Sequence, residues 1–204
     1  MTVEVSELAT DLARHGCILF GEFKLSSGIT SPYYIDLRAV PSYPHLFETV
    51  TDAYVERIKE LGERYSRISG IATAGIPIAS LVAYKLRAPF LYVRKEERTH
   101  GTGNLVEGTV KKGDVVLLLD DVATTGGSLV RAITALREKG AVVNSVLVMI
   151  DREQGAAEAL SKLGARLHSI TTASELAEEL HLKGMLKKDD YERVVRYIRG
   201  DKGV

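Results

Sequence analysis

Short apolar runs alternate with segments of helical spacing along residues 67–170, and this alternation is the main structural signal of the chain. The runs are apolar at almost every position, which is typical of strands buried on both faces of a sheet. They cover residues 67–72, 89–93, 115–119, 142–150 and 167–170, with helices expected over 76–87, 127–139 and 155–163. This order predicts an α/β fold with a five-stranded parallel core that helices cover on two sides.

The flanking segments add helices and one strand to this core. The expected elements are a helix capped by Ser6 and running toward His15, a strand over residues 34–37, a helix over residues 45–61, and two closing helices capped by Ser174 and Asp189. Ligands of parallel sheets bind beyond the carboxyl ends of the strands. The loops after residues 72, 93, 119 and 150 are therefore the expected place of a site.

Composition limits the classes of function. The 204 residues suit one domain, and 27 basic against 27 acidic side chains leave no net charge, which disfavours a protein that binds nucleic acid through its phosphates. The longest apolar run, 115–119, is far too short to cross a bilayer, and acids occupy the start of the chain where a signal peptide would be basic. With one cysteine, Cys17, no intrachain disulfide forms. We therefore expect a cytoplasmic protein with no membrane or nucleic-acid partner.

The strongest chemical motif is VVLLLDDVATTGGS, residues 115–128. A buried strand delivers Asp120 and Asp121 to its carboxyl end, and small residues then lead into a helix. Successive backbone N–H groups in such a turn converge on an anion, and the helix N-terminus favours negative charge. The two acids suit sugar hydroxyls, or Mg²⁺ through water. The motif predicts a site for a phosphorylated sugar rather than a strand that ends in solvated acids.

Two related phosphate motifs are absent. An apolar strand that ends in acids also occurs in P-loop NTPases, but the sequence GxxxxGK[ST] is missing. The GTG at residues 101–103 lacks the third glycine of a dinucleotide-binding loop and follows charged residues rather than a strand.

Positive side chains gather in residues 94–104, RKEERTHGTGN. They are Arg94, Lys95, Arg98 and His100. A solvated loop offset by Glu96 and Glu97 is the simpler interpretation, since runs of charge are usually surface. Next to a phosphate loop on the same edge of the sheet, a polyanion-binding loop that closes over its ligand becomes the favoured interpretation.

The segment VLLLDDVATTGGS resembles the signature of the type I phosphoribosyltransferases, which bind 5-phosphoribosyl-1-pyrophosphate (PRPP). Four further segments resemble the orotate branch of that family: FKLSSGITSPYYIDLR, GIATAGIPIA, RKEERTHGTGNLVEG and MIDREQGA. They follow the family's order from residue 20 to residue 156. The resemblance implies the type I phosphoribosyltransferase fold, a single domain over residues 1–204, with a hood mainly from residues 1–42 and the C-terminus and a core from about 43 to 172.

The resemblance also assigns roles to residues. PRPP would be bound by Thr73, Ala74, Gly75, Arg94, Lys95, Arg98, His100, Asp120, Asp121, Val122, Ala123, Thr124, Thr125, Gly126, Gly127 and Ser128. Orotate would be bound by Ser26, Tyr34, Ile35, Thr124 and Arg152, with the planar guanidinium of Arg152 facing its carboxylate. The groups closest to the chemistry would be Arg98, His100, Asp120 and Asp121.

The implied reaction joins orotate and PRPP to give orotidine 5′-monophosphate and pyrophosphate, in the synthesis of UMP. Mg²⁺ would bind mainly through PRPP, with Asp120 and Asp121 reached through water. The resemblance further implies a homodimer in which the cationic loop acts partly across the interface. Two rivals stay open: the same chemistry on a purine base or uracil, and a regulator that senses PRPP on this fold.

Three residues depart from the pattern of bacterial relatives, which often carry lysine at these positions: Ser26, Ala74 and Arg98. The first two changes remove positive charge near pyrophosphate. An arginine at position 98 keeps its charge but stays protonated, so it suits charge stabilisation and not proton donation. The departures bear on rate and mechanism more than on the class of substrate.

Overall fold

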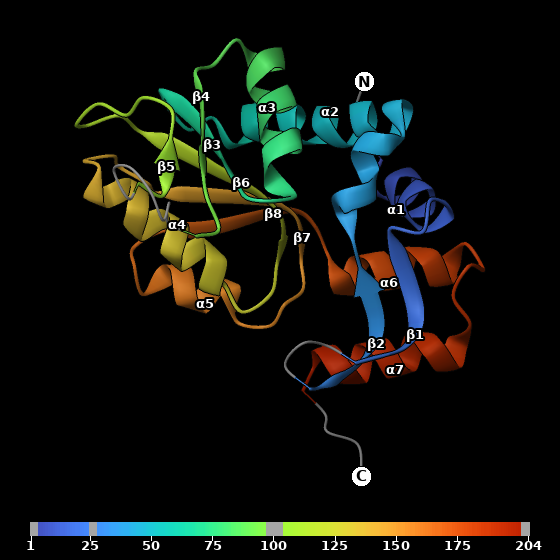
Figure 1. Ribbon diagram of the computed structural model, residues 1–204. Coiled ribbons are helices and arrows are strands. Elements are labelled where there is room, and N and C mark those ends of the chain that lie inside the picture. Colours follow the sequence, from blue (N-terminus) through green and yellow to red (C-terminus); the bar gives the residue numbers. More distant parts are fainter. Residues whose placement is uncertain (1–3, 25–27, 97–103, 201–204) are drawn as a thin grey trace.

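A six-stranded sheet with the order β5-β4-β3-β6-β7-β8 forms the centre of the computed structural model, which describes residues 4–24, 28–96 and 104–200 (Figure 1). The parallel strands are β3 (Arg67–Ile71), β4 (Phe90–Val93), β6 (Val116–Ala123), β7 (Ser145–Asp151) and β8 (Arg166–Thr172). The predicted α/β fold with a central parallel sheet is thus confirmed. The sequence does not predict β5 (Val106–Glu107), which pairs antiparallel with β4 at the edge.

Helices cover both faces of this sheet, which explains why its strands are apolar at successive positions. Leu117 and Leu119 of β6 join one hydrophobic core, whereas Val116 and Leu118 join the other. The helices are α2 (Pro44–Leu61) and α3 (Gly75–Leu86) on the first core, and α4 (Gly127–Glu138) and α5 (Ala156–Ser161) on the second. Among the described residues, no helix combines the length and apolar character that crossing a membrane requires.

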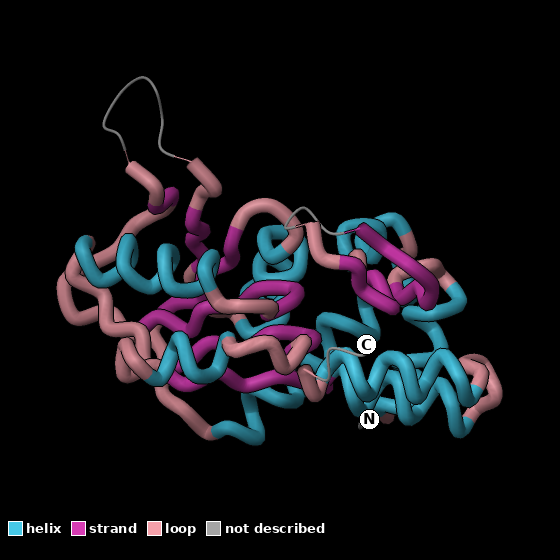
Figure 2. The backbone as a smooth tube through the Cα atoms, turned by 90° about the horizontal axis from the view of Figure 1, so that it is seen from below, coloured by secondary structure: helices cyan, strands magenta, loops and turns pink. Residues whose placement is uncertain are grey.

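A second sheet of two antiparallel strands lies beside the core, and we call the unit around it the hood (Figures 1 and 2). Elements from the N-terminal and C-terminal parts of the chain pack together here, because α7 packs against β2 and α6 against α1. The elements of the hood are α1 (Val5–Arg14), β1 (Ile18–Lys24), β2 (Thr30–Ile35), the 3₁₀ helix η1 (Leu37–Ser42), α6 (Ala173–Leu182) and α7 (Lys188–Ile198). The division into hood and core at residues 42 and 172 stays a prediction.

The three expected helix caps are wrong. Ser6 and Asp189 lie inside the first turns of α1 and α7 rather than before them. Thr172 caps α6 in place of Ser174: its hydroxyl accepts from the N–H of Glu175 (3.1 Å), and the Glu175 carboxylate accepts from the N–H of Thr172 (2.8 Å). This reciprocal arrangement satisfies two free N–H groups at once, which a serine inside the helix does not.

Strand β6 is longer than the apolar run predicts. It continues to Ala123, so Asp120 and Asp121 belong to the strand and not to the loop after it. Asp120 pairs with Val148 of β7, and Val122 pairs with Ile150. The hydrogen-bonded ladder therefore fixes the backbone of both acids.

Candidate active site

The carboxyl ends of β3, β6 and β7 lie side by side because these strands are neighbours in the sheet. The loop after β3 holds Thr73 and Ala74, the end of β6 carries Asp120 and Asp121, and Arg152 follows β7. The structure therefore brings three of the sequence-predicted groups to one edge of the sheet.

Asp120 and Asp121 form a buried acid pair at this edge. Asp120 is only 6% exposed, and burial raises its pKa well above the ordinary value, with a further rise from the charge of Asp121. Burial also raises the pKa of Asp121. The hydroxyl of buried Tyr54 donates a hydrogen bond to the backbone carbonyl of Asp120 (2.6 Å) and holds the strand there. Two adjacent carboxyl groups held in this way can accept hydrogen bonds from the neighbouring hydroxyls of a ribose.

The first residue of α3 lies directly against the acid pair. A Cβ added at Gly75 would lie 2.7 Å from Oδ1 of Asp120 and 3.2 Å from its Cα. A Cβ at Gly70 would likewise lie 2.8 Å from the carbonyl oxygen of Gly75 and 2.9 Å from the Cβ of Ala79. These small residues let α3 approach both strands closely, so that the preceding loop with Thr73 lies next to the acids.

The turn after β6 lines an open hollow of about 370 Å³ at the start of α4. Gly126 has a φ of 83°, a left-handed conformation that favours glycine. A Cβ added there would also lie 3.1 Å from the Cα of Ala156. The N-terminus of α4 supplies free N–H groups that suit a phosphate. The lining residues are Val122, Thr124, Thr125, Gly126, Gly127, Ser128 and Arg131.

The residues that line this hollow differ in two ways from those that the sequence predicts. Ala123 is buried in the second core and contributes its carbonyl oxygen, which accepts a hydrogen bond from the N–H of Arg152 (2.9 Å). Arg131 also lines the hollow. The sequence does not predict this role, because an arginine on the exposed face of a helix looks like any other surface arginine.

Arg152 lies at the junction of core and hood. Its guanidinium is buried, with 8% of the residue exposed, and it contacts the side chains of Ser31 and Tyr33 on β2. The turn that carries it is fixed by Glu153, whose N–H donates to the carboxylate of Asp151 (2.9 Å). The predicted orotate-facing arginine is therefore held at the same edge as the acid pair, and two residues of the hood to which the sequence assigns no role hold it there.

Tyr34 and Ile35 lie at the end of β2. The ring of Tyr34 stacks on Phe23 with centroids 5.6 Å apart, and its hydroxyl accepts a hydrogen bond from Arg38 (3.1 Å). Arg38 is also paired with Asp36 (2.5 Å), which lowers the pKa of that carboxyl. Ile35 packs against the first core. The end of β2 is thus ordered by contacts among neighbouring side chains of the hood.

The cationic segment lies only partly within the described residues. The N–H of Arg94 donates to the carbonyl of Leu105 (2.8 Å), and its guanidinium lies 3.2 Å from the carboxylate of Glu107. Lys95 is exposed. Ser26, Arg98 and His100 lie outside the described residues, so their roles stay predictions.

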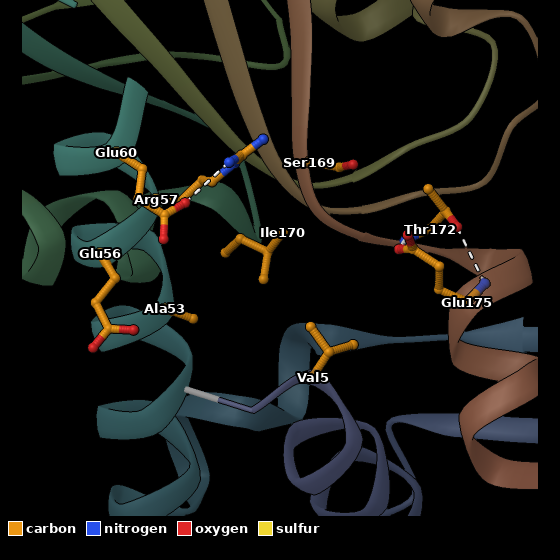
Figure 3. A pocket seen from close by; sticks show the side chains of 9 residues that line it. All are labelled: Val5, Ala53, Glu56, Arg57, Glu60, Ser169, Ile170, Thr172 and Glu175. Atoms are coloured by element: carbon orange, nitrogen blue, oxygen red, sulfur yellow. Dashed lines mark hydrogen bonds and ion pairs between the residues drawn. The ribbon is translucent and has the colours of Figure 1, made fainter. Parts of the chain in front are cut away.

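A separate pocket lies between α2, β8 and the first residues of α1 and α6 (Figure 3). Arg57 and Glu60 face each other on α2 at 3.0 Å, and Glu175 belongs to the cap of α6. Of the predicted site residues that the structure describes, none lines this pocket. The acid pair, the hollow and Arg152 therefore remain the candidate site.

Known proteins match the chain over most of its length. The model of the phosphoribosyl transferase domain family matches residues 41–184. The orotate phosphoribosyltransferase of Cenarchaeum symbiosum is 42% identical over 187 residues, which are 91% of this chain and 92% of that protein. The crystal structure of orotate phosphoribosyltransferase from Aeropyrum pernix is 40% identical, with a TM-score of 0.78 over 86% of this chain and 98% of that one.

A third match has a bound ligand. The orotate phosphoribosyltransferase of Mycobacterium tuberculosis in complex with PRPP is 29% identical, with a TM-score of 0.66 over 84% of this chain and 97% of that one. Together with the parallel sheet and the groups at its carboxyl edge, these matches define a phosphoribosyl transferase. Within that class the chain belongs to the orotate phosphoribosyltransferase family, and the resemblance read from its motifs is confirmed.

Proposed function

We propose that this chain transfers the 5-phosphoribosyl group of PRPP to orotate, giving orotidine 5′-monophosphate and pyrophosphate. The observation that carries the proposal is the buried guanidinium of Arg152 at the same sheet edge as the acid pair and the phosphate hollow. It offers a planar cation to the carboxylate of orotate beside groups that suit a phosphorylated ribose. The relative that binds PRPP supports the identity of the donor.

The reaction needs no nucleophile from the protein. The bond between the anomeric carbon and pyrophosphate breaks with its electron pair on pyrophosphate. The ring nitrogen of orotate forms the new bond and loses its proton to the departing pyrophosphate or to solvent. Positive charge develops on the ribose beside Asp120 and Asp121, which accept hydrogen bonds from its hydroxyls. Backbone N–H groups of residues 73–75 and 124–128 hold pyrophosphate and the 5-phosphate in place. Arg98 and His100 are the proposed further partners of pyrophosphate.

Mg²⁺ is the proposed cofactor. Among the described residues, no group of three His, Cys, Asp or Glu side chains could hold a metal ion, whereas the acid pair supplies two carboxylates. Proteins commonly bind Mg²⁺ through one or two carboxylates together with water and substrate phosphates. The residues therefore fit an ion that arrives with PRPP and meets Asp120 and Asp121 through water.

The proposal is tested by following the ultraviolet absorbance of orotate with PRPP and Mg²⁺, beside adenine, xanthine and uracil. We expect turnover of orotate alone. Uracil is the sharpest comparison because it is the same ring without the carboxylate. Arg152→Ala is expected to raise KM for orotate about tenfold to hundredfold, from the loss of charge-assisted hydrogen bonds, and to leave KM for PRPP within about twofold.

Other results of this assay point to the rivals. Turnover of another base would keep the PRPP site and reject orotate as the acceptor. Binding of PRPP without turnover of any base would favour the regulator.

A cytoplasmic location is part of the proposal, and the single cysteine, Cys17, is buried and unpaired.

A homodimer is also part of the proposal, with the outward face of α3 as its interface. Tyr84 is 65% exposed on this face, and the other outward residues, Ile76, Pro77 and Leu81, are only partly covered. An apolar helix face beside the site is suited to a second copy, since two-fold dimers are the commonest assembly. The same helix begins at Gly75, so a partner bound here lies next to the loop of Thr73 and Ala74, the proposed pyrophosphate loop.

The double variant Leu81→Glu, Tyr84→Glu is expected to be a monomer with strongly reduced activity, because each new carboxylate would be buried at the interface. Sedimentation velocity measures the change from the mass of two chains to that of one. Val142→Glu is the matched control: Val142 is also an exposed apolar residue (40%), but it precedes β7 at the amino-terminal edge of the sheet. A monomeric parent protein, or a double variant that stays dimeric, would reject this interface.

A further inference from the structure

Two hydroxyl groups of the hood hold the guanidinium of Arg152. Its Nε donates a hydrogen bond to Oη of Tyr33 (3.3 Å), and its Nη2 donates one to Oγ of Ser31 (3.5 Å). Its Cζ also lies 4.8 Å from the centroid of the Tyr33 ring. Tyr33 and Ser31 are 2% and 0% exposed. A residue of the core thus takes its orientation from a strand of the hood.

These contacts use one particular edge of the guanidinium. The group is a rigid planar fork with five N–H donors, and Nε and Nη2 lie on the same side edge. A carboxylate pairs with such a fork through two parallel hydrogen bonds to a single edge. Because the hood contacts the side edge of Arg152, the edge formed by Nη1 and Nη2 is the one presented to a carboxylate.

Each acceptor is itself fixed in place. The hydroxyl of Ser31 donates to the carbonyl of Tyr33 (2.7 Å), and its oxygen accepts from the N–H of Tyr33 (3.4 Å) as well as from Arg152. The ring of Tyr33 meets Tyr197 of α7 edge-on, with centroids 5.9 Å apart and planes at 86°. Burial raises the pKa of Tyr33, which keeps its hydroxyl neutral. Neutral acceptors in locked positions orient a cation without neutralising its charge.

We propose that Tyr33 and Ser31 are positioning residues for base recognition: they hold Arg152 so that its free edge faces the carboxylate of orotate. This inference rests on the proposed function and adds to it a role for the hood. The contacts involve the base-binding arginine and none of the residues that line the phosphate hollow. Their loss therefore acts on orotate and not on PRPP.

Tyr33→Phe is the most direct test because it keeps the ring over Arg152 and removes only the hydroxyl. We expect KM for orotate to rise about tenfold, as for a lost hydrogen bond to a charged group, with KM for PRPP within about twofold of the parent value. Ser31→Ala is expected to act in the same direction with a smaller effect, because its contact is longer. Tyr65→Phe, at a partly buried tyrosine just before β3, is the control and leaves both KM values unchanged.

A double-mutant cycle separates positioning from a merely structural role. In an Arg152→Ala background, Tyr33→Phe is expected to leave KM for orotate unchanged, because no guanidinium remains to be oriented. An effect that persists in that background, or a Tyr33→Phe variant with the parent KM for orotate, would overturn the inference. In either case the proposed function would stand as long as the parent protein consumes orotate; a parent without that activity would reject the function itself.

Discussion

Asp120→Asn is expected to lower kcat/KM by about 10²–10³-fold, the size of effect that follows the loss of one electrostatic group in an active site, and to raise the melting temperature at neutral pH. Asparagine keeps the shape of the side chain and an oxygen that accepts hydrogen bonds. In the proposed reaction it removes the negative charge that faces the developing positive charge on the ribose. The same charge is buried at the end of β6 and repelled by Asp121, so its removal stabilises the folded chain.

The pH dependence of this stabilisation has a definite sign. Burial raises the folded-state pKa of Asp120 well above the ordinary 3.8. Below that ordinary value the carboxyl is protonated in both the folded and the unfolded chain and has no net effect. As pH rises above it, the unfolded chain loses the proton first, and this costs folding stability until the folded-state pKa is passed. The melting temperature of Asp120→Asn should therefore exceed that of the parent by a margin that grows above pH 4.

Asp114→Asn is the matched control because the same substitution is expected to have the opposite effect on stability. Asp114 forms an ion pair with Arg67, and the hydrogen bond from that guanidinium lowers its pKa. Its charge therefore stabilises the folded chain above the ordinary pKa, and the variant should melt below the parent at neutral pH with full activity. Thermal melts from pH 4 to pH 8 and steady-state kinetics measure both variants. An active Asp120→Asn, or one less stable than the parent, would contradict the role given to the buried charge.

The core of the fold is readable from the sequence because its central strands β3, β6 and β7 are buried on both faces. The run Val116 to Leu119 alternates between two hydrophobic cores, so apolar residues are needed at every position. The hood offers no such signal. Strand β1 alternates weakly between buried and exposed positions, and β5 has only two residues, too few for any period to show.

The candidate site also has one part that the sequence predicts and one part that it does not. The acid pair and the phosphate turn are contiguous in sequence, and local backbone geometry dictates their residue types, so a motif reveals them. The position of the Arg152 guanidinium depends instead on a contact with Tyr33, which lies 119 residues away in the chain. In the sequence, Tyr33 and Tyr34 are adjacent tyrosines of one strand, and only packing against the core shows which of them meets the guanidinium.

Gly75→Ala is expected to lower kcat/KM about a hundredfold, since a misplacement of about 1 Å at a catalytic group has an effect of this size. The added methyl would lie 2.7 Å from Oδ1 of Asp120 and 3.2 Å from both its Cα and the carbonyl oxygen of Leu119. The strand cannot yield, because it lies between β3 and β7 in the sheet. Either α3 moves outward with the pyrophosphate loop, or the Asp120 carboxyl turns away from the ribose.

The same overpacking is expected to destabilise the chain by about 1–3 kcal/mol, which thermal melts would measure. Gly127→Ala separates this clash from the general effect of a methyl group at a helix start. A Cβ at Gly127 meets nothing within 4 Å, so that variant should melt no lower than the parent. It controls for stability only, since Gly127 lines the phosphate hollow. A fully active and fully stable Gly75→Ala would show that α3 does not need its close approach to Asp120, and the acid pair would then owe its position to β6 alone.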